Sequence, residues 1–299
     1  MLRRTSSLVA FAAVLALALC ACSPRAELRA RWPRADRERS VARPSETALW
    51  PLTGKPAIDD TAAASSAVLL AVADEPAAAS LPGLDSADVV YEVALGGKDV
   101  IAALFQSSLP SSAGPLRVAS GADGALAAAY RARLAGRPQS GGAALADVAS
   151  LAAIPATAGV GAPPPGMFGA QEASTSAGSA TQIDVPLAAG SKAEWHYDVA
   201  SGAYQRFVDA KPALAGGSKL IRATNVIVIW VPPQAVWPDP AMTGSGRASV
   251  FVAGRKYVGS WETSGGPPSL RDLGGVPIAL LPGNTWYEVV GTAANIVLH

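Results

Sequence analysis

The chain has 299 residues, of which 50% are hydrophobic and 16% are charged, so it can form a packed core and is not disordered throughout. The formal net charge is only +1, and no long basic run follows the first 49 residues, which argues against nucleic acid as a partner. The chain has two cysteines, Cys20 and Cys22, and two histidines, His196 and His299. This inventory excludes a disulfide scaffold and a thiolate or histidine-rich metal centre, and we expect no metal and no cofactor.

The first 22 residues have the pattern of an export signal. Two arginines at positions 3 and 4 precede an apolar run from Leu8 to Leu19, which is shorter than the roughly 20 residues of a membrane-spanning helix. The junction Leu19-Cys20-Ala21-Cys22 resembles the lipobox of bacterial lipoproteins. We therefore predict a lipoprotein signal peptide over 1–21 and lipid attachment at Cys22, on the extracytoplasmic face of the cell membrane. The alternative is an ordinary secretory signal with incidental cysteines.

Residues 22–49 are predicted to be a basic tether. Seven arginines and four acidic residues lie between Ser23 and Leu49, and three prolines interrupt any helix. Two interpretations are equally compatible with this segment. Its arginines could lie against anionic lipid headgroups, or it could be a solvated linker.

The region 50–153 is predicted to be a mixed α/β domain. Short apolar runs predict strands over 68–72, 87–93 and 100–107, and Gly96-Gly97 predicts a hairpin turn between the last two. Alanine-rich amphipathic patterns predict helices over 124–134 and 143–153.

The segment 154–181 is rich in Ala, Gly, Pro and Ser and is predicted to be a linker. After it, short β-type runs separated by glycine-containing turns predict a β-rich domain over 182–299, of sandwich or barrel-like form. The runs are 194–198, 203–208, 225–231, 248–252, 256–261 and 285–290. The expected fold class is α+β, with a mixed α/β N-terminal domain followed by a mostly-β C-terminal domain.

An ordered series of short motifs resembles the YerB-like bacterial lipoproteins, the family of domain of unknown function 3048 with its N- and C-terminal domains. In the first half the motifs are Trp50-Pro51-Leu52-Thr53-Gly54, Ala87-Asp88-Val89-Val90-Tyr91-Glu92 and Gly114-Pro115-Leu116-Arg117. In the second half they are Trp195-His196-Tyr197-Asp198, Tyr204-Gln205-Arg206, Asn225-Val226-Ile227-Val228, Gly244-Ser245-Gly246, Gly259-Ser260-Trp261 and Gly283-Asn284-Thr285-Trp286. The chain departs from the family pattern after Arg117, where Val118 and Ser120 replace the usual serine and second arginine.

Three polar residues in the first domain are the candidate ligand-binding site. Strand periodicity places Asp88 and Glu92 on one face, and Arg117 could bind a carboxylate or phosphate through its planar guanidinium. Two carboxylates near an arginine could instead act as an acid/base pair. The structural alternative is that the acids are exposed or ion-paired and that Arg117 anchors a loop.

The second domain offers little that points to catalysis. His196 stands alone on a predicted strand, and the chain has no Gly-x-Ser-x-Gly, His-Glu-x-x-His or P-loop motif. Trp195, Trp230, Trp261 and Trp286 are expected in the core, with a sugar-binding surface as the alternative. We therefore predict an envelope lipoprotein without catalytic residues, which binds or scaffolds a cell-wall polymer or envelope proteins. The alternative is an envelope or cell-wall-active enzyme that uses Asp88, Glu92 and Arg117.

Overall fold

The computed structural model describes residues 47–72, 80–136, 144–153, 167–169, 178–232 and 243–299. The predicted signal peptide, Cys22, nearly all of the tether and most of the segment 154–181 lie outside these residues. No helix in the described part of the chain is long and apolar enough to cross a membrane.

The predicted strands and hairpin of the first region are present. Its elements are α1 (Asp60–Ala63), β1 (Val68–Val72), the 3₁₀ turn η1 (Leu84–Ser86), β2 (Val89–Leu95), β3 (Lys98–Phe105), α2 (Gly121–Ala129), β4 (Arg133–Ala135) and α3 (Val148–Ala153). β1 has the predicted bounds. Strands β2 and β3 pair through a two-residue turn in which Gly96 and Gly97 have φ of 61° and 75°, the left-handed geometry that favours glycine.

Helix α2 begins three residues before the predicted position and ends earlier. Its start is set by a capping box, in which the Ser120 hydroxyl accepts from the Asp123 amide and the Asp123 carboxylate accepts from the Ser120 amide at 2.6 Å. The residues predicted to end the helix instead form β4, because Arg133–Ala135 pair with β1 in parallel. Tertiary pairing thus overrides the helical pattern here.

The second region is almost entirely β-structure. Its strands are β5 (Gly178–Ser179), β6 (Gln182–Pro186), β7 (Lys192–Asp198), β8 (Ala203–Val208), β9 (Lys211–Pro212), β10 (Arg222–Ala223), β11 (Asn225–Val231), β12 (Thr243–Val252), β13 (Arg255–Ser264), β14 (Ser269–Asp272), β15 (Thr285–Gly291) and β16 (Val297–Leu298), with one 3₁₀ turn, η2 (Ala188–Gly190). The fold as a whole is mostly β, as predicted for this half of the chain.

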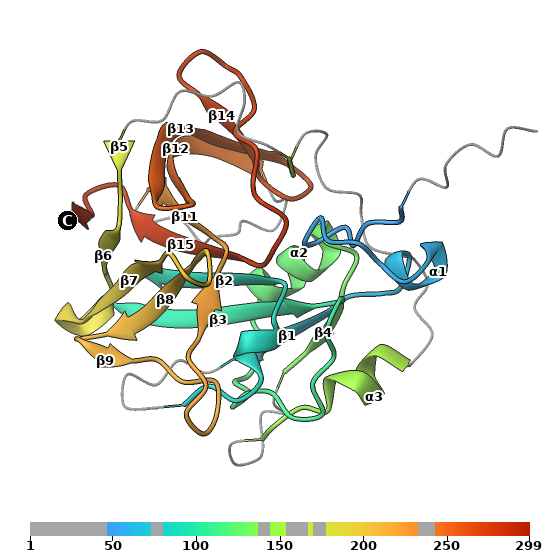
Figure 1. Cartoon of the computed structure of the whole chain (residues 1–299). Coiled ribbons are helices and arrows are strands. Elements are labelled where there is room, and N and C mark those ends of the chain that lie inside the picture. Colours follow the sequence, from blue (N-terminus) through green and yellow to red (C-terminus); the bar gives the residue numbers. More distant parts are fainter. Residues whose placement is uncertain (1–46, 73–79, 137–143, 154–166, 170–177, 233–242) are drawn as a thin grey trace, which may run out of the picture. The chain divides into compact units, whose positions relative to one another are not determined.

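The two predicted domains share one sheet. The large sheet has the order β14-β13-β12-β11-β15-β2-β3-β1-β4, and β15 pairs in parallel with β11 on one side and with β2 on the other (Figure 1). A smaller sheet has the order β10-β8-β7-β6-β16. Residues 46–299 therefore form one compact unit, and the second region is not a self-contained sandwich or barrel. Its strands β11 to β15 complete a sheet that the first region begins.

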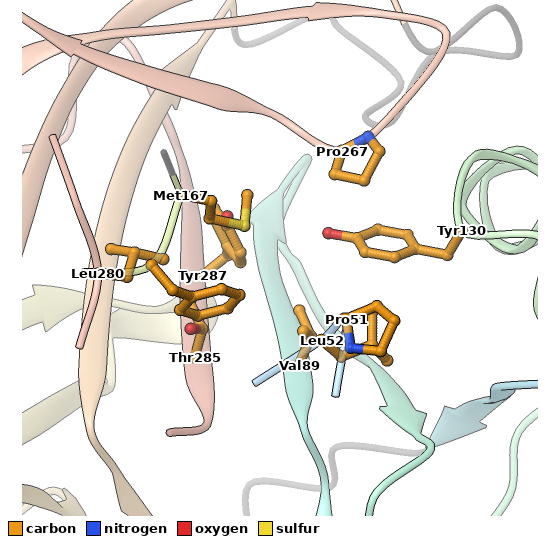
Figure 2. Close-up of a pocket in the computed structure, with 10 residues that line it drawn as sticks. Pro51, Leu52, Val89, Tyr130, Met167, Pro267, Leu280, Thr285 and Tyr287 are labelled. Carbon is orange, nitrogen blue, oxygen red and sulfur yellow. The ribbon is translucent and has the colours of Figure 1, made fainter. Parts of the chain in front are cut away.

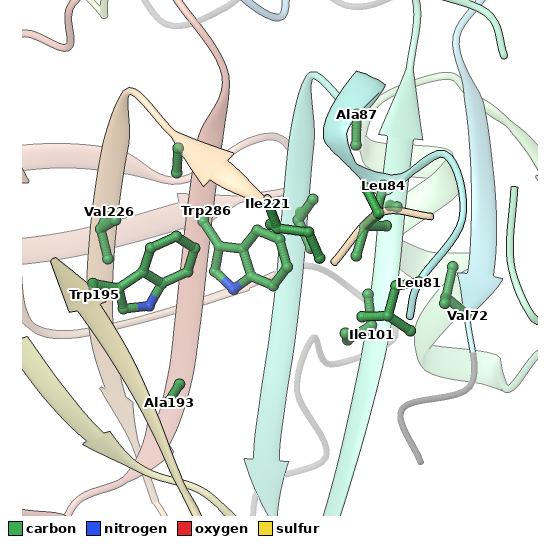
Figure 3. Close-up of a cluster of buried hydrophobic side chains, with 14 of the residues drawn as sticks. Val72, Leu81, Leu84, Ala87, Ile101, Ala193, Trp195, Ile221, Val226 and Trp286 are labelled. Carbon is green, nitrogen blue, oxygen red and sulfur yellow. The ribbon is translucent and has the colours of Figure 1, made fainter. Parts of the chain in front are cut away.

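Each face of the large sheet has its own hydrophobic cluster. Alternate residues of β2 show this, since Val90 lies in the cluster that the small sheet covers and Tyr91 lies in the cluster that includes α2. Trp195 and Trp286 meet edge to face between the two sheets, with ring centroids 5.2 Å apart (Figure 3). The predicted core positions of Trp195, Trp230, Trp261 and Trp286 are confirmed, because none is more than 6% exposed.

Candidate functional site

Asp88 fixes the backbone at the beginning of β2. Its carboxylate accepts hydrogen bonds from the amides of Gln106 and Ser107, at 2.5 and 2.7 Å, and from the Ser107 hydroxyl. Burial raises the pKa of this carboxyl, and the bonds from Ser107 and Gln106 oppose that rise only in part. Asp88 therefore holds the end of β3 against the start of β2.

Arg117 forms a bidentate ion pair with Asp123 of α2, in which both N···O distances are 2.7 Å. The same guanidinium donates to the carbonyls of Val72 and Ile101. Burial raises the pKa of Asp123, but the Arg117 guanidinium and Ser120 more than offset it, so the pKa lies below its usual value. Arg117 thus ties α2 to β1 and β3.

This ion pair predicts a pH-dependent stability. Because the folded-state pKa of Asp123 is lowered, its contribution is complete above the unfolded pKa of about 3.9 and is lost as pH falls through the folded pKa. We expect Asp123→Asn to lower the free energy of unfolding by about 1–3 kcal/mol at pH 7. The difference from the wild type should shrink below about pH 4, as measured by urea unfolding across pH. A difference that stays constant down to the lowest pH would contradict this role.

Glu92 lies in the core between the two sheets. Its side chain is fully buried and forms an ion pair with Arg206 of β8, while its other oxygen accepts from the Trp286 indole at 3.0 Å. The Arg206 guanidinium also lies over the Trp286 ring, 5.2 Å from its centroid. Glu92 thus faces the small sheet, whereas its neighbour Tyr91 lies in the hydrophobic cluster on the opposite face of the large sheet.

A second glutamate lies beside the first. Glu288 of β15 is the register partner of Glu92, is fully buried, and accepts from the Trp195 indole at 2.8 Å. Two acids of the large sheet therefore meet an arginine and a tryptophan of the small sheet. We call Glu92, Glu288, Arg206, Trp195 and Trp286 the inter-sheet cluster. Four of its members, all except Glu288, belong to the motifs that carry the family resemblance. Those motifs therefore include residues that join the two sheets.

The structure does not bring the three predicted site residues together. In the described part of the chain, no hydrogen bond or ion pair joins any two of Asp88, Glu92 and Arg117, and each has partners of its own. Sequence reasoning missed Arg206 and Glu288. Glu288 could have been noticed because it is the single acid inside the apolar run Trp286–Val290. Such a run predicts a buried strand, and a charge buried there requires a partner.

The structure also shows where the other residues discussed in the sequence analysis lie. The His196 ring stacks on Phe207, with centroids 4.6 Å apart, and its side chain is 40% exposed. Gly246 packs against Trp261, where a Cβ atom would lie only 2.8 Å from the indole nitrogen. The described residues contain no group of three or more His, Cys, Asp or Glu side chains that could hold a metal ion.

An apolar cleft lies where β2 and β15 begin. Figure 2 shows Tyr130 on one side of it and Met167, Leu280 and Tyr287 on the other. The Tyr130 hydroxyl is paired with that of Tyr91 at 2.7 Å. Since the free volume is about 10 Å³, the cleft holds no more than one water molecule. It is a packing defect at the start of two central strands and is too small for a ligand.

These observations define a mostly-β protein whose two sheets are joined by a buried cluster of acids, arginine and tryptophans. The chain belongs to the family described as protein of unknown function DUF3048, whose N-terminal domain model matches residues 52–175 and whose C-terminal domain model matches residues 183–287. The resemblance inferred from the motifs is thereby confirmed.

The fold is similar to that in the crystal structure of the YerB protein from Bacillus subtilis. The TM-score is 0.66 with 18% sequence identity, over 83% of this chain and 99% of that chain. At this identity the similarity concerns the fold. No curated protein matches the chain.

Proposed function

We propose that the protein is an exported envelope lipoprotein, held at the membrane through lipid on Cys22, which acts by binding rather than by catalysis. The candidate partners are a cell-wall polymer or other envelope proteins. The observation that carries the second part of this proposal is that Asp88, Glu92 and Arg117 are each committed to bonds within the protein.

The membrane anchor is supported by the leader. A short basic start, an apolar run too short to span a bilayer and a small residue before Cys22 occur together in the expected order. A lipidated cysteine provides one attachment signal, and the arginines between Ser23 and Leu49 offer a second one on an anionic membrane.

A binding role is supported by the contacts that the candidate polar residues make within the protein. An acid/base pair needs side chains that converge on a substrate, at hydrogen-bonding distance from the atoms that react. Here Asp88 fixes a strand end, Arg117 fixes a helix and Glu92 joins two sheets. An enzyme that uses these three residues would have to break the bonds that hold the fold.

The anchor is tested by metabolic labelling with a fatty acid and by detergent-phase partitioning. We expect the wild type to be labelled and to enter the detergent phase, and Cys22→Ser to lose the label and remain as an uncleaved or unlipidated form, because the thiol is the acceptor. Cys20→Ser is the matched control and should behave like the wild type, since bulky Leu19 precedes that cysteine. Label that persists in Cys22→Ser would refute the proposal.

A further inference from the structure

A hollow lies on the large sheet, on the face that the small sheet partly covers. It has a volume of about 250 Å³ and is formed by β11, β12, β13 and the turn that follows β15. The lining residues that matter here are Trp230, Arg247, Ser249, Lys256, Val258 and Asn295. We call it the β12 hollow.

Arg247 is held in place over this hollow although it is exposed. Its guanidinium lies 4.2 Å from the centroid of the Trp230 ring, and its Nη2 donates to the Thr292 carbonyl at 3.4 Å. The Trp230 indole is itself fixed, because it donates to the Ala294 carbonyl at 2.9 Å. An arginine stacked on an aromatic ring keeps the in-plane edge of its N–H groups available for a planar anion.

No acid neutralises Arg247 in the described residues, where it forms no ion pair with a carboxylate. None of the residues that line the hollow is acidic, and Lys256 contributes a second basic side chain to it. The Arg247 guanidinium therefore gives the hollow a positive electrostatic potential, and the apolar walls strengthen that potential locally.

The floor of the hollow contains the hydroxyl group of a serine. Ser249 is only 3% exposed, lies opposite Val258 in the β12–β13 register and lines the hollow. Within the part of the chain that the structure describes, no protein group hydrogen-bonds to its side chain. Because Ser249 lines the hollow, its hydroxyl is available to donate a hydrogen bond to a group that enters.

We propose that the β12 hollow binds an oxyanion, the carboxylate or phosphate group of a small ligand or of a lipid headgroup. Arg247 supplies a charge-assisted bidentate contact, and the Ser249 hydroxyl donates a hydrogen bond from the floor. This inference rests on the binding function proposed above and names the class of ligand. It involves none of the residues of the inter-sheet cluster.

The test is equilibrium dialysis of the full-length chain in neutral detergent against radiolabelled inorganic phosphate, with acetate as the carboxylate probe. We expect saturable binding that weakens about tenfold or more in Arg247→Gln, because one charge-assisted contact is lost. Ser249→Ala should weaken binding by a smaller factor. Arg255→Gln is the matched control, since it removes the same charge one residue from Lys256 at a side chain that does not line the hollow.

Short-chain phosphatidylglycerol, with phosphatidylcholine as its control, distinguishes the two possible sources of the oxyanion, a lipid headgroup and a small soluble ligand. If phosphatidylglycerol displaces the labelled phosphate at a lower concentration than unlabelled phosphate does, the ligand is a lipid headgroup. If it displaces the label equally well or less well, the ligand is a free anion. No saturable binding of any of these anions, or equal losses in Arg247→Gln and Arg255→Gln, overturns the proposal. Detergent-phase partitioning of the same wild-type preparation reports the anchor separately, so a failure of the anion site is distinguishable from a failure of membrane attachment.

Discussion

Replacing Arg206 with alanine is expected to lower the free energy of unfolding by about 3–5 kcal/mol, because the change leaves the Glu92 carboxylate in the core without the guanidinium that pairs with it. The side chains of Arg206 and Glu92 are 2% and 0% exposed, so water cannot take the place of the lost charge. Such a loss is a large fraction of the roughly 5–15 kcal/mol by which folded domains are typically stable. Thermal and urea unfolding of the full-length chain would measure it.

Two further variants separate charge burial from a general effect of losing an arginine. Arg222→Ala is the matched control, since Arg222 is exposed on β10 of the same sheet and should change stability little. Adding Glu92→Gln to Arg206→Ala should restore part of the lost stability, because the neutral amide is cheaper to bury than an unpaired carboxylate. An Arg206→Ala protein as stable as Arg222→Ala would show that the pair is not essential to the core.

The isolated fragment 182–299 is expected to lack a cooperative unfolding transition. Removing residues before it deprives β15 of β2, its parallel neighbour, and deprives Trp286 and Arg206 of Glu92. The fragment would expose the edge of a strand that is buried over six of its seven residues. Calorimetry and near-ultraviolet circular dichroism of the fragment would test this expectation.

A complementation experiment is the control for the fragment. When residues 47–181 are expressed separately and mixed with the fragment, β2 becomes available and the transition should return. A sharp transition in the fragment alone would mean that the second region folds by itself, as its sequence suggested.

Local elements could be predicted because their signals are local. β1, β8 and β11 have the predicted bounds, since each is an uninterrupted β-type run between turn residues. The hairpin of β2 and β3 follows from Gly96-Gly97. The partners of β15 could not be predicted, because its runs of apolar residues fit any buried strand and carry no information about which strand lies beside it.

The candidate site was only partly predictable for the same reason. Asp88, Glu92 and Arg117 stood out as polar residues in apolar surroundings, and all three do make important contacts. Whether such residues bind a ligand or one another depends on partners elsewhere in the chain. Glu92 meets Arg206 only because two sheets pack face to face, and no local spacing encodes that arrangement. The β12 hollow could not be predicted, because Arg247 and Ser249 have the sequence pattern of an ordinary exposed strand.

The central place of β15 has a consequence for biosynthesis. Both neighbours of β15 precede it in the chain, so each has an unpaired edge until residues Thr285–Gly291 have been synthesised. Pairing between segments so distant in the chain is intrinsically slow. A chain that stops before Thr285 would therefore lack the middle of the large sheet, and β2 and β11 would each keep an unpaired edge.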